Sequence, residues 1–261
     1  SKQLGDGKLL HQLTKKKIIY NFRKNDILNG GEGAPLTPIF HQLISSKKKI
    51  ELPVCILNIG GISNITIVKK PIGSLELFSE DIGPGNCLID EWVRKNSNKK
   101  FDFDGLLATN GKKNEIIIEQ AQNLYSGRKN IKKKSLDTRD FDISFARGLS
   151  LEDGAATLTD FTASIIGVAL TSIIEKNENQ IKNIIVCGGG RKNSLLMSLI
   201  KSYIPKKINL KLIDEYGING DFVESQAFAY LAVRSSKKLP ISFPTTTSCS
   251  KPSTGGEIIE N

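Results

Sequence analysis

A carboxylate stands directly before a rigid turn in the segment Asp81-Ile82-Gly83-Pro84-Gly85-Asn86. The pattern predicts a strand that ends at Asp81, then a turn, then a helix that Asn86 caps. The positive end of that helix would keep Asp81 ionised, and an ionised carboxylate can act as a general base. The alternative is an Asx-turn, in which Asp81 caps only its own loop. The local sequence does not choose between the two.

Two glycine turns could receive a phosphate or a flat ligand. Gly60-Gly61 separates two apolar runs, and its amide groups have no side chain in front of them. An ordinary type I′ hairpin turn is the alternative there. Gly188-Gly189-Gly190 follows a buried-type strand and, with Asn193, leads into a helix whose N-terminus could bind an anion. This second turn matches neither the P-loop nor the dinucleotide-binding fingerprint.

A fourth loop, residues 30–36, reads Gly-Gly-Glu-Gly-Ala-Pro-Leu and follows Arg23 and Asp26. Its small residues suggest backbone that lies against a ligand. Arg23 could pair with a substrate carboxylate, or it could form a surface salt bridge. The two histidines stand apart from each other, and His41 is interpreted as a helix residue with a satisfied partner.

Strands and helices alternate along the chain, which predicts an α/β architecture with a mixed sheet. Strands are expected at 18–22, 52–59, 64–69, 75–78, 182–186 and 208–213. Helices are expected at 39–43, 86–94, 115–124, 150–175, 194–201 and 221–234, with Asp153 or Thr157 as a cap within the fourth. The tail at 239–254 is rich in Pro, Ser and Thr and is expected to run over the surface.

Composition narrows the class of protein. The 261 residues carry a net charge of +10, but the lysines form short scattered runs such as 15–17, 47–49, 99–100 and 132–134. No aromatic side chains interleave with them, so a nucleic-acid binder is the weaker interpretation and no nucleic acid is expected. No apolar run approaches about 18 residues, so no membrane partner is expected either. The four cysteines lack metal-ligand spacing and are interpreted as reduced thiols of a cytoplasmic protein.

Taken together, these motifs resemble those of the anhydro-N-acetylmuramic acid kinase family, and they occur in the family's order. Matching segments are 3–7, 21–26, 30–36, 58–64, 81–86, 101–105, 134–135, 186–193 and 220–231. The resemblance implies an actin-like (ribonuclease H-like) fold with two lobes and mixed sheets. Residues 1–50 would be the remainder of the first lobe, 51–220 the second lobe, and 221–261 a returning helix and tail.

The resemblance also implies an activity. Such kinases use ATP to open the 1,6-anhydro ring of anhydro-N-acetylmuramic acid and to phosphorylate O6, giving N-acetylmuramic acid 6-phosphate for cell-wall recycling. They are cytoplasmic and typically dimeric, and Mg²⁺ would bridge the phosphates, although no metal ligand is assigned. By motif, Asp81 would be the catalytic base. Nucleotide contacts would come from Gly60, Gly61, Gly188, Gly189, Gly190 and Asn193, and sugar contacts from Arg23, Gly31, Gly33, Ala34, Pro35, Gly83 and Glu224.

The sequence also departs from the family pattern. The chain begins with Ser1 and lacks the family's opening Gly-Thr-Ser-x-Asp-Gly loop, so a truncated and incomplete first lobe is expected, with an inactive or poorly stable fragment. Asn21, Glu32, Ile82 and Ser248 replace the family's Asp, Gln, Thr and Gly. A non-catalytic sugar-binding relative without the first phosphate loop is therefore the alternative function.

Overall fold

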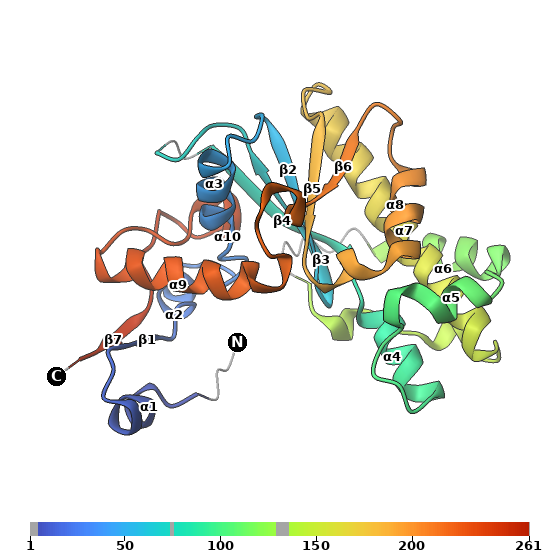
Figure 1. The fold of residues 1–261 in the computed structure, drawn as a ribbon, viewed down its shortest axis with the longest axis horizontal. Coiled ribbons are helices and arrows are strands. Elements are labelled where there is room, and N and C mark those ends of the chain that lie inside the picture. Colours follow the sequence, from blue (N-terminus) through green and yellow to red (C-terminus); the bar gives the residue numbers. More distant parts are fainter. Residues whose placement is uncertain (1–4, 74–75, 129–135, 261) are drawn as a thin grey trace. The chain divides into compact units, whose positions relative to one another are not determined.

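The computed structural model describes residues 5–73, 76–128 and 136–260 of the chain (Figure 1). By their contacts the residues divide into two compact units. Unit 1 comprises Ser1–Leu52, Thr66–Glu80 and Phe222–Asn261, and unit 2 comprises Pro53–Ile65 and Asp81–Asp221. Several expected features fall outside the described residues: part of the 3–7 motif, residue 75 of an expected strand, the 132–134 lysine run and the 134–135 motif.

Five strands form a mixed sheet in the order β4-β3-β2-β5-β6. The strands are β2 (Val54–Ile59), β3 (Ile62–Val68), β4 (Leu77–Pro84), β5 (Asn183–Cys187) and β6 (Asn209–Leu212). β2 runs parallel to β5, and β5 runs parallel to β6. β2 and β3 are neighbours joined only by Gly60 and Gly61, so they run antiparallel. The predicted mixed sheet is therefore confirmed.

The centre of this sheet is buried because its sequence is apolar on both faces. Val54, Cys55, Ile56 and Leu57 of β2 and residues 184–187 of β5 have no exposed surface. Continuous apolar runs of this kind are typical of parallel strands covered on both sides. Parallel strands share one carboxyl edge, so the segments that follow β2 and β5 begin at the same edge of the sheet.

Unit 2 is built around the long helix α7 (Leu151–Lys176). Figure 1 shows α4, α5 and α6 gathered at one end of it, and α8 packs along it. Gly154 and Gly167 let neighbours approach α7 closely, since a Cβ there would meet the ring of Trp92 and the side chain of Tyr203, each at 2.2 Å. The other helices of the unit are α4 (Cys87–Asn96), α5 (Leu106–Asn110), α6 (Glu115–Arg128) and α8 (Ser194–Tyr203).

Unit 1 pairs the beginning and the end of the chain. β1 (Ile18–Tyr20) and β7 (Glu257–Ile259) form a two-stranded antiparallel sheet. The α-helices in the described part of this unit are α1 (Gly7–Thr14), α2 (Lys24–Leu28), α3 (Pro38–Lys47), α9 (Val223–Ser236) and α10 (Pro244–Thr247). Short 3-10 turns also occur, at 103–105, 138–140, 144–146, 189–192, 213–216 and 220–222.

One predicted helix cap is wrong, and a second is confirmed in position only. Ser150, and neither Asp153 nor Thr157, caps α7, because its hydroxyl accepts a hydrogen bond from the Asp153 N–H at 3.1 Å. Asn86 does occupy the N-cap position of α4, but its side chain makes no capping hydrogen bond. A helix start can therefore be located from sequence even where the role of its side chain cannot.

Other boundaries also differ from prediction. β1 ends at Tyr20 because Asn21 adopts a positive φ of 58°, and α2 begins at Lys24. β4 continues to Pro84, so Asp81 lies inside a strand and not at its end. The tail does not simply run over the surface, since Ile241, Phe243 and Cys249 are buried.

The long helix α7 corrects the expectation that no apolar segment approaches the length of a membrane span. Among the described residues it alone is long and apolar enough to cross a membrane by length and composition. However, 78% of its most apolar stretch is buried inside the protein, as in the core helix of a folded unit. All four cysteines are unpaired thiols, three of them buried and Cys87 half-buried.

Candidate functional site

Three of the loops singled out from the sequence meet around Asn86 in unit 2. The Asn86 amide group donates to the carbonyl oxygens of Gly60 at 3.0 Å and Ile59 at 3.4 Å. The Asn86 N–H also donates to the Gly60 carbonyl, at 2.7 Å. A Cβ on Gly190 would lie 3.1 Å from the Asn86 side-chain oxygen. The hairpin turn, the start of α4 and the glycine turn after β5 therefore form one connected surface.

The Gly60-Gly61 turn is not the type I′ turn that was the alternative interpretation, because neither glycine has a positive φ. A Cβ would meet nothing closer than 3.5 Å at Gly60 and 3.4 Å at Gly61. Neither local conformation nor packing inside the described chain requires glycine here. The missing side chains instead clear space at the surface, as a site for a close ligand would need.

The expectation that both amides of this turn are exposed is wrong for Gly60. Its N–H donates to the Ile62 carbonyl oxygen at 3.2 Å. Both turn carbonyls are also used, because Gly85 and Cys87 donate to that of Gly61 at 2.9 and 3.2 Å. Gly61 is exposed, and within the described chain its N–H makes no hydrogen bond. Gly61 is thus the residue of the turn that can offer an amide to an anion.

The three glycines after β5 differ in whether the fold requires glycine at their positions. Gly188 has a φ of +84°, and a Cβ there would lie 2.6 Å from the Ile59 carbonyl oxygen. Gly190 packs against Ile59, where a Cβ would come within 2.2 Å of a methyl group. Gly189 has neither restriction, and its nearest neighbour would be Asn86 at 3.9 Å. Packing explains the outer two, and only the middle glycine faces open space.

Asp81 lies half-buried in β4, and its Oδ2 accepts a hydrogen bond from the Leu136 N–H at 2.7 Å. This contact joins β4 to a segment 55 residues further along the chain, which is not the local loop of an Asx-turn. Two residues on, Gly83 leaves no room for a side chain, since a Cβ would meet Ile165 at 2.6 Å. The carboxylate is therefore held on a rigid strand by a partner outside its own turn.

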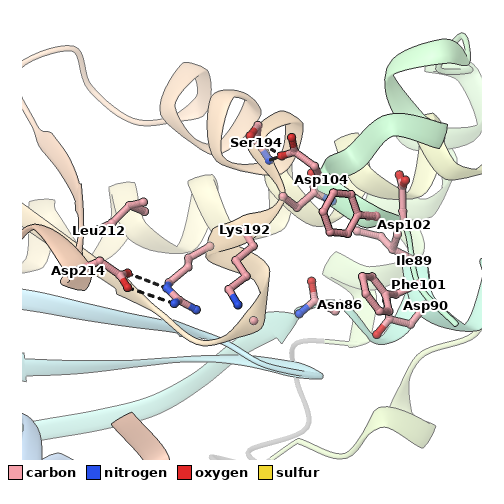
Figure 2. A pocket seen from close by; sticks show the side chains of 14 residues that line it. Asn86, Ile89, Asp90, Phe101, Asp102, Asp104, Lys192, Ser194, Leu212 and Asp214 are labelled. Atoms are coloured by element: carbon pink, nitrogen blue, oxygen red, sulfur yellow. Dashed lines mark hydrogen bonds and ion pairs between the residues drawn. The ribbon is translucent and has the colours of Figure 1, made fainter. Parts of the chain in front are cut away.

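A cavity of about 800 Å³ opens beside the glycine turn after β5 (Figure 2). One end of it in Figure 2 carries Leu212 and Asp214, and the opposite end carries Asp90 and Phe101. Gly189 and Asn193, two of the predicted nucleotide contacts, line this cavity, and Asn86 joins them. The side-chain oxygen of Asn193 also caps α8 through the Leu196 N–H at 2.9 Å.

Arg191 is buried at the wall of this cavity and fixes the glycine turn. Its guanidinium donates to Asp214 at 2.7 and 3.2 Å, to Asp221 at 2.9 Å and to the Gly188 carbonyl at 3.1 Å. The Arg191 hydrogen bond lowers the pKa of Asp214 to about 2. This arginine therefore holds a positive charge and a rigid turn in place before any ligand arrives.

Besides Asp214, three more carboxylates line the cavity, and they differ in their hydrogen-bond partners. Asp102 accepts from the N–H groups of Leu107 at 2.8 Å and Ala108 at 3.0 Å, at the start of α5. Asp104 binds the Ser194 hydroxyl and N–H, and the hydroxyl contact lowers the Asp104 pKa. Both side chains therefore hold neighbouring backbone in place within the described chain. For Asp90, by contrast, burial raises the pKa to about 6, and the nearby Asp102 adds to this.

In unit 1, the glycine-rich loop wraps around the buried carboxylate of Asp26. That carboxylate accepts from the Gly33 N–H at 2.7 Å and from the Thr247 hydroxyl at 2.6 Å. A Cβ on Gly31 would meet it at 2.2 Å, so contact with Asp26 explains this glycine without any ligand. Arg23 forms no surface salt bridge among the described residues. It donates to the Gly33 carbonyl at 2.9 Å.

Of the other predicted sugar contacts, Ala34, Pro35 and Glu224 also lie in unit 1, whereas Gly83 lies in unit 2. Ala34 and Pro35 continue the loop and are half-buried, whereas Glu224 is exposed in the first turn of α9. Nothing in the described residues gathers three or more His, Cys, Asp or Glu side chains as a metal site would. His41 is buried and bonded to the Thr66 hydroxyl at 2.8 Å, and burial lowers its pKa to about 4.

Comparison with known proteins decides the family. The family model described as anhydro-N-acetylmuramic acid kinase matches residues 1–261. The chain belongs to this family. A protein of that name from Pelagibacter ubique is 54% identical over the whole chain, which spans 69% of the relative. Those from Zymomonas mobilis and Phenylobacterium zucineum are 40% and 37% identical over 98% and 99% of the chain, which spans 67% of each.

Among solved structures, an activator of 2-hydroxyisocaproyl-CoA dehydratase from Clostridium difficile with bound ADPNP aligns with a TM-score of 0.43 and 14% identity. The alignment covers 76% of this chain and 67% of that one. Independently of it, the strands of the five-stranded sheet lie in the order 3-2-1-4-5 when numbered within the sheet. This order, with an antiparallel hairpin beside parallel strands, agrees with the ribonuclease H-like fold expected of the family.

Sequence reasoning missed several residues of the cavity. The sequence pattern predicts only a cap at Asn86, and it assigns no site role to Arg191, Lys192, Asp90 and Phe101. A signal for Arg191 and Lys192 was their charge, because two adjacent basic residues directly follow a glycine turn. The exposed Phe101 and Phe103 offered another, since apolar rings in a polar segment often contact ligands.

Proposed function

We propose that this chain carries the activity of its family. It would use ATP to open the 1,6-anhydro ring of anhydro-N-acetylmuramic acid and to phosphorylate O6, yielding N-acetylmuramic acid 6-phosphate and ADP. Support comes from the family match over all 261 residues and from the 54% identity to a relative of that name. We also propose the wider setting of the family: a cytoplasmic, homodimeric enzyme of peptidoglycan recycling.

Asp81 is proposed as the general base. It takes a proton from a water molecule as the water oxygen bonds to the anomeric carbon. The bond from that carbon to O6 breaks, and O6 then attacks the γ-phosphorus of ATP as ADP leaves. The observation that carries this role is the hydrogen bond from the Leu136 N–H, which fixes one carboxylate oxygen on a rigid strand. General-base help of this kind contributes roughly 10²–10⁴-fold to rate.

The nucleotide is proposed to use the surface around Asn86. The base and ribose would occupy the cavity beside Gly189 and Asn193, and the phosphates would approach the free amide of Gly61. Gly188 and Gly190 would act by shaping their turn, and Gly60 by leaving space open for the phosphates, rather than by direct contact. Each charge-assisted hydrogen bond from an amide to a phosphate is worth about 1.5–3 kcal/mol.

Magnesium fits this arrangement as an ion that arrives with the nucleotide. Mg²⁺ usually keeps several waters and binds through one or two carboxylates plus phosphate oxygens, so it needs no all-protein cage. The lack of a three-residue cluster in the described chain is compatible with that mode. When bound, the ion would neutralise charge on the transferring phosphoryl group.

The sugar is proposed to contact the loop that Asp26 organises. Arg23 has one guanidinium nitrogen on the Gly33 carbonyl, which leaves further donors for the lactyl carboxylate of the sugar. Gly31, Gly33, Ala34 and Pro35 would present backbone to it, and Glu224 is proposed as a further contact. Because Gly31 is tied to Asp26, this loop would be preformed before the sugar binds.

The test is turnover of anhydro-N-acetylmuramic acid with ATP by the protein and by its Asp81→Asn variant. The amide oxygen of asparagine can still accept from the Leu136 N–H, so the fold should survive. We expect kcat to fall by roughly 10²–10⁴-fold while nucleotide affinity stays within about twofold. Asp142→Asn, at an exposed aspartate that accepts hydrogen bonds from Ser144, is the matched control. Normal turnover by Asp81→Asn would overturn the assignment.

A further inference from the structure

Asp90 is a half-buried carboxylate without a hydrogen-bond donor at the wall of the cavity. It lies in the first turn of α4 and lines the cavity with Phe101 (Figure 2). In the described part of the chain its carboxylate interacts electrostatically with Arg94 and Asp102 but accepts no hydrogen bond. The Arg94 guanidinium is instead directed to the Lys100 carbonyl, at 3.4 Å. The cavity wall therefore holds an acceptor that the protein leaves unsatisfied.

Asp90 is half-buried and lines an open cavity, so water can donate to it while the cavity holds no ligand. A ligand that displaces this water has to supply a donor in its place, because leaving the carboxylate without one would cost about 1–3 kcal/mol. The neighbouring carboxylates have donors, since Asp102 has two backbone N–H groups and Asp104 has Ser194. Asp90 alone of these three has none. The missing donor is expected to come from the ligand.

The surroundings of Asp90 match a nucleobase better than a sugar or a phosphate. Phe101 and Phe103 are 52% and 70% exposed, and Ile89 adds a further apolar wall. Flat aromatic ligands stack on such rings, with about 1–3 kcal/mol gained per base. A phosphate would be repelled by the carboxylate. Among the atoms of ATP, the exocyclic 6-amino group of adenine is the donor on the edge of a flat, stackable ring.

We propose that Asp90 reads the 6-amino group of adenine and is thereby a specificity-determining residue for the nucleotide. The inference rests on the proposed function, because it needs ATP in this cavity. The base would stack on Phe101 with its amino edge toward Asp90, and the ribose would lie toward Gly189. A carboxylate at this position favours a base that offers a donor and disfavours one that does not.

The probe is purine riboside 5′-triphosphate, which lacks the 6-amino group but is otherwise ATP. Its affinity and that of ATP are measured by calorimetry for the protein and for Asp90→Ala and Asp90→Asn. The protein should bind ATP about 10- to 100-fold more tightly than the probe. Asp90→Ala should reduce this ratio to within about threefold, because ATP loses its acceptor and the probe no longer faces a carboxylate without a donor. Asp90→Asn keeps a neutral acceptor and should give an intermediate ratio.

Two control variants and two possible outcomes distinguish recognition of the base by Asp90 from binding of ATP in this cavity. Glu91→Gln changes the next carboxylate of α4, which pairs with Lys95 at 2.6 Å and does not line the cavity. The ratio of ATP affinity to probe affinity should therefore be the same in this variant as in the unchanged protein. Phe101→Ala should weaken ATP and the probe equally, because stacking does not need the amino group. If ATP binds but the ratio is unchanged in both Asp90 variants, base reading is wrong. If neither nucleotide binds, the proposed function itself fails.

Discussion

The side-chain amide of Asn86 donates a hydrogen bond to the carbonyl oxygen of Gly60 at 3.0 Å. This single contact ties the start of α4 to the turn between β2 and β3, 26 residues earlier in the chain. A second contact, to the Ile59 carbonyl at 3.4 Å, leaves both amide hydrogens occupied. Asn86 therefore acts as a clamp between the proposed phosphate turn and the nucleotide cavity that it also lines.

Replacing Asn86 by aspartate tests this clamp with almost no change in shape. A carboxylate would face two carbonyl oxygens and donate to neither, so the turn should loosen. We expect a loss of about 1–3 kcal/mol in the free energy of unfolding, and a KM for ATP raised by about tenfold or more. Urea unfolding and steady-state kinetics measure the two effects. Asn110→Asp, at an exposed residue of α5, should change neither by much.

The glycines of the site should divide into two classes on substitution by alanine. Gly61→Ala meets only a 3.4 Å contact with Thr138 and needs no positive φ, so the fold should keep its melting temperature within about 2 °C. Its methyl group would nevertheless stand where a phosphate is proposed to bind, and kcat/KM should fall.

Gly85→Ala should do the opposite, because its Cβ would lie 2.3 Å from the Gly60 carbonyl oxygen. We expect destabilisation of about 1–3 kcal/mol, typical of overpacking, before any effect on ligands. Thermal unfolding together with activity of both variants checks the contrast. Equal melting temperatures for Gly61→Ala and Gly85→Ala would contradict it.

The sequence was sufficient to predict most strands and helices because their apolar patterns are local. The buried run of β2 and the long apolar helix α7 are examples. The sequence also singles out the glycine turns after β2 and β5, which the structure brings together around Asn86. It could not separate Gly189 from Gly188 and Gly190, because the difference depends on Ile59, which is distant in the chain. Nor could the sequence predict that the Asn86 side chain bonds to the turn between β2 and β3, since an asparagine before a helix usually caps that helix.

Arg191 illustrates the same limit and supports a further prediction. Its partners Asp214 and Asp221 lie 23 and 30 residues away, beyond any local pattern. Arg191→Lys keeps the charge but loses the planar fork that reaches both carboxylates and the Gly188 carbonyl. We expect a loss of about 2–4 kcal/mol in unfolding free energy, because two carboxylates lose a buried partner. The neighbouring Lys192→Ala removes only an exposed pair with Asp221 and should cost less than about 1 kcal/mol.

Asp90 should give unit 2 an unusual dependence of stability on pH. Burial, together with Asp102 and against Arg94, raises its pKa to about 6, above its ordinary value near 3.8. Between these two values the folded protein binds a proton at Asp90 more tightly than the unfolded chain does. The Asp90 contribution to stability therefore improves as the pH falls from about 7 to about 4, and is lost as the pH rises through 6.

The measurement is urea unfolding of the protein and of Asp90→Asn at intervals between pH 4 and pH 7.5. The variant has no titrating group at this position, so its advantage over the unchanged protein should be greatest at pH 7.5 and should shrink toward pH 4. Asp214 does not confuse the comparison, since the Arg191 contact lowers its pKa to about 2 and its effect lies below this window. A constant difference across the range would show that Asp90 titrates as an ordinary surface carboxylate.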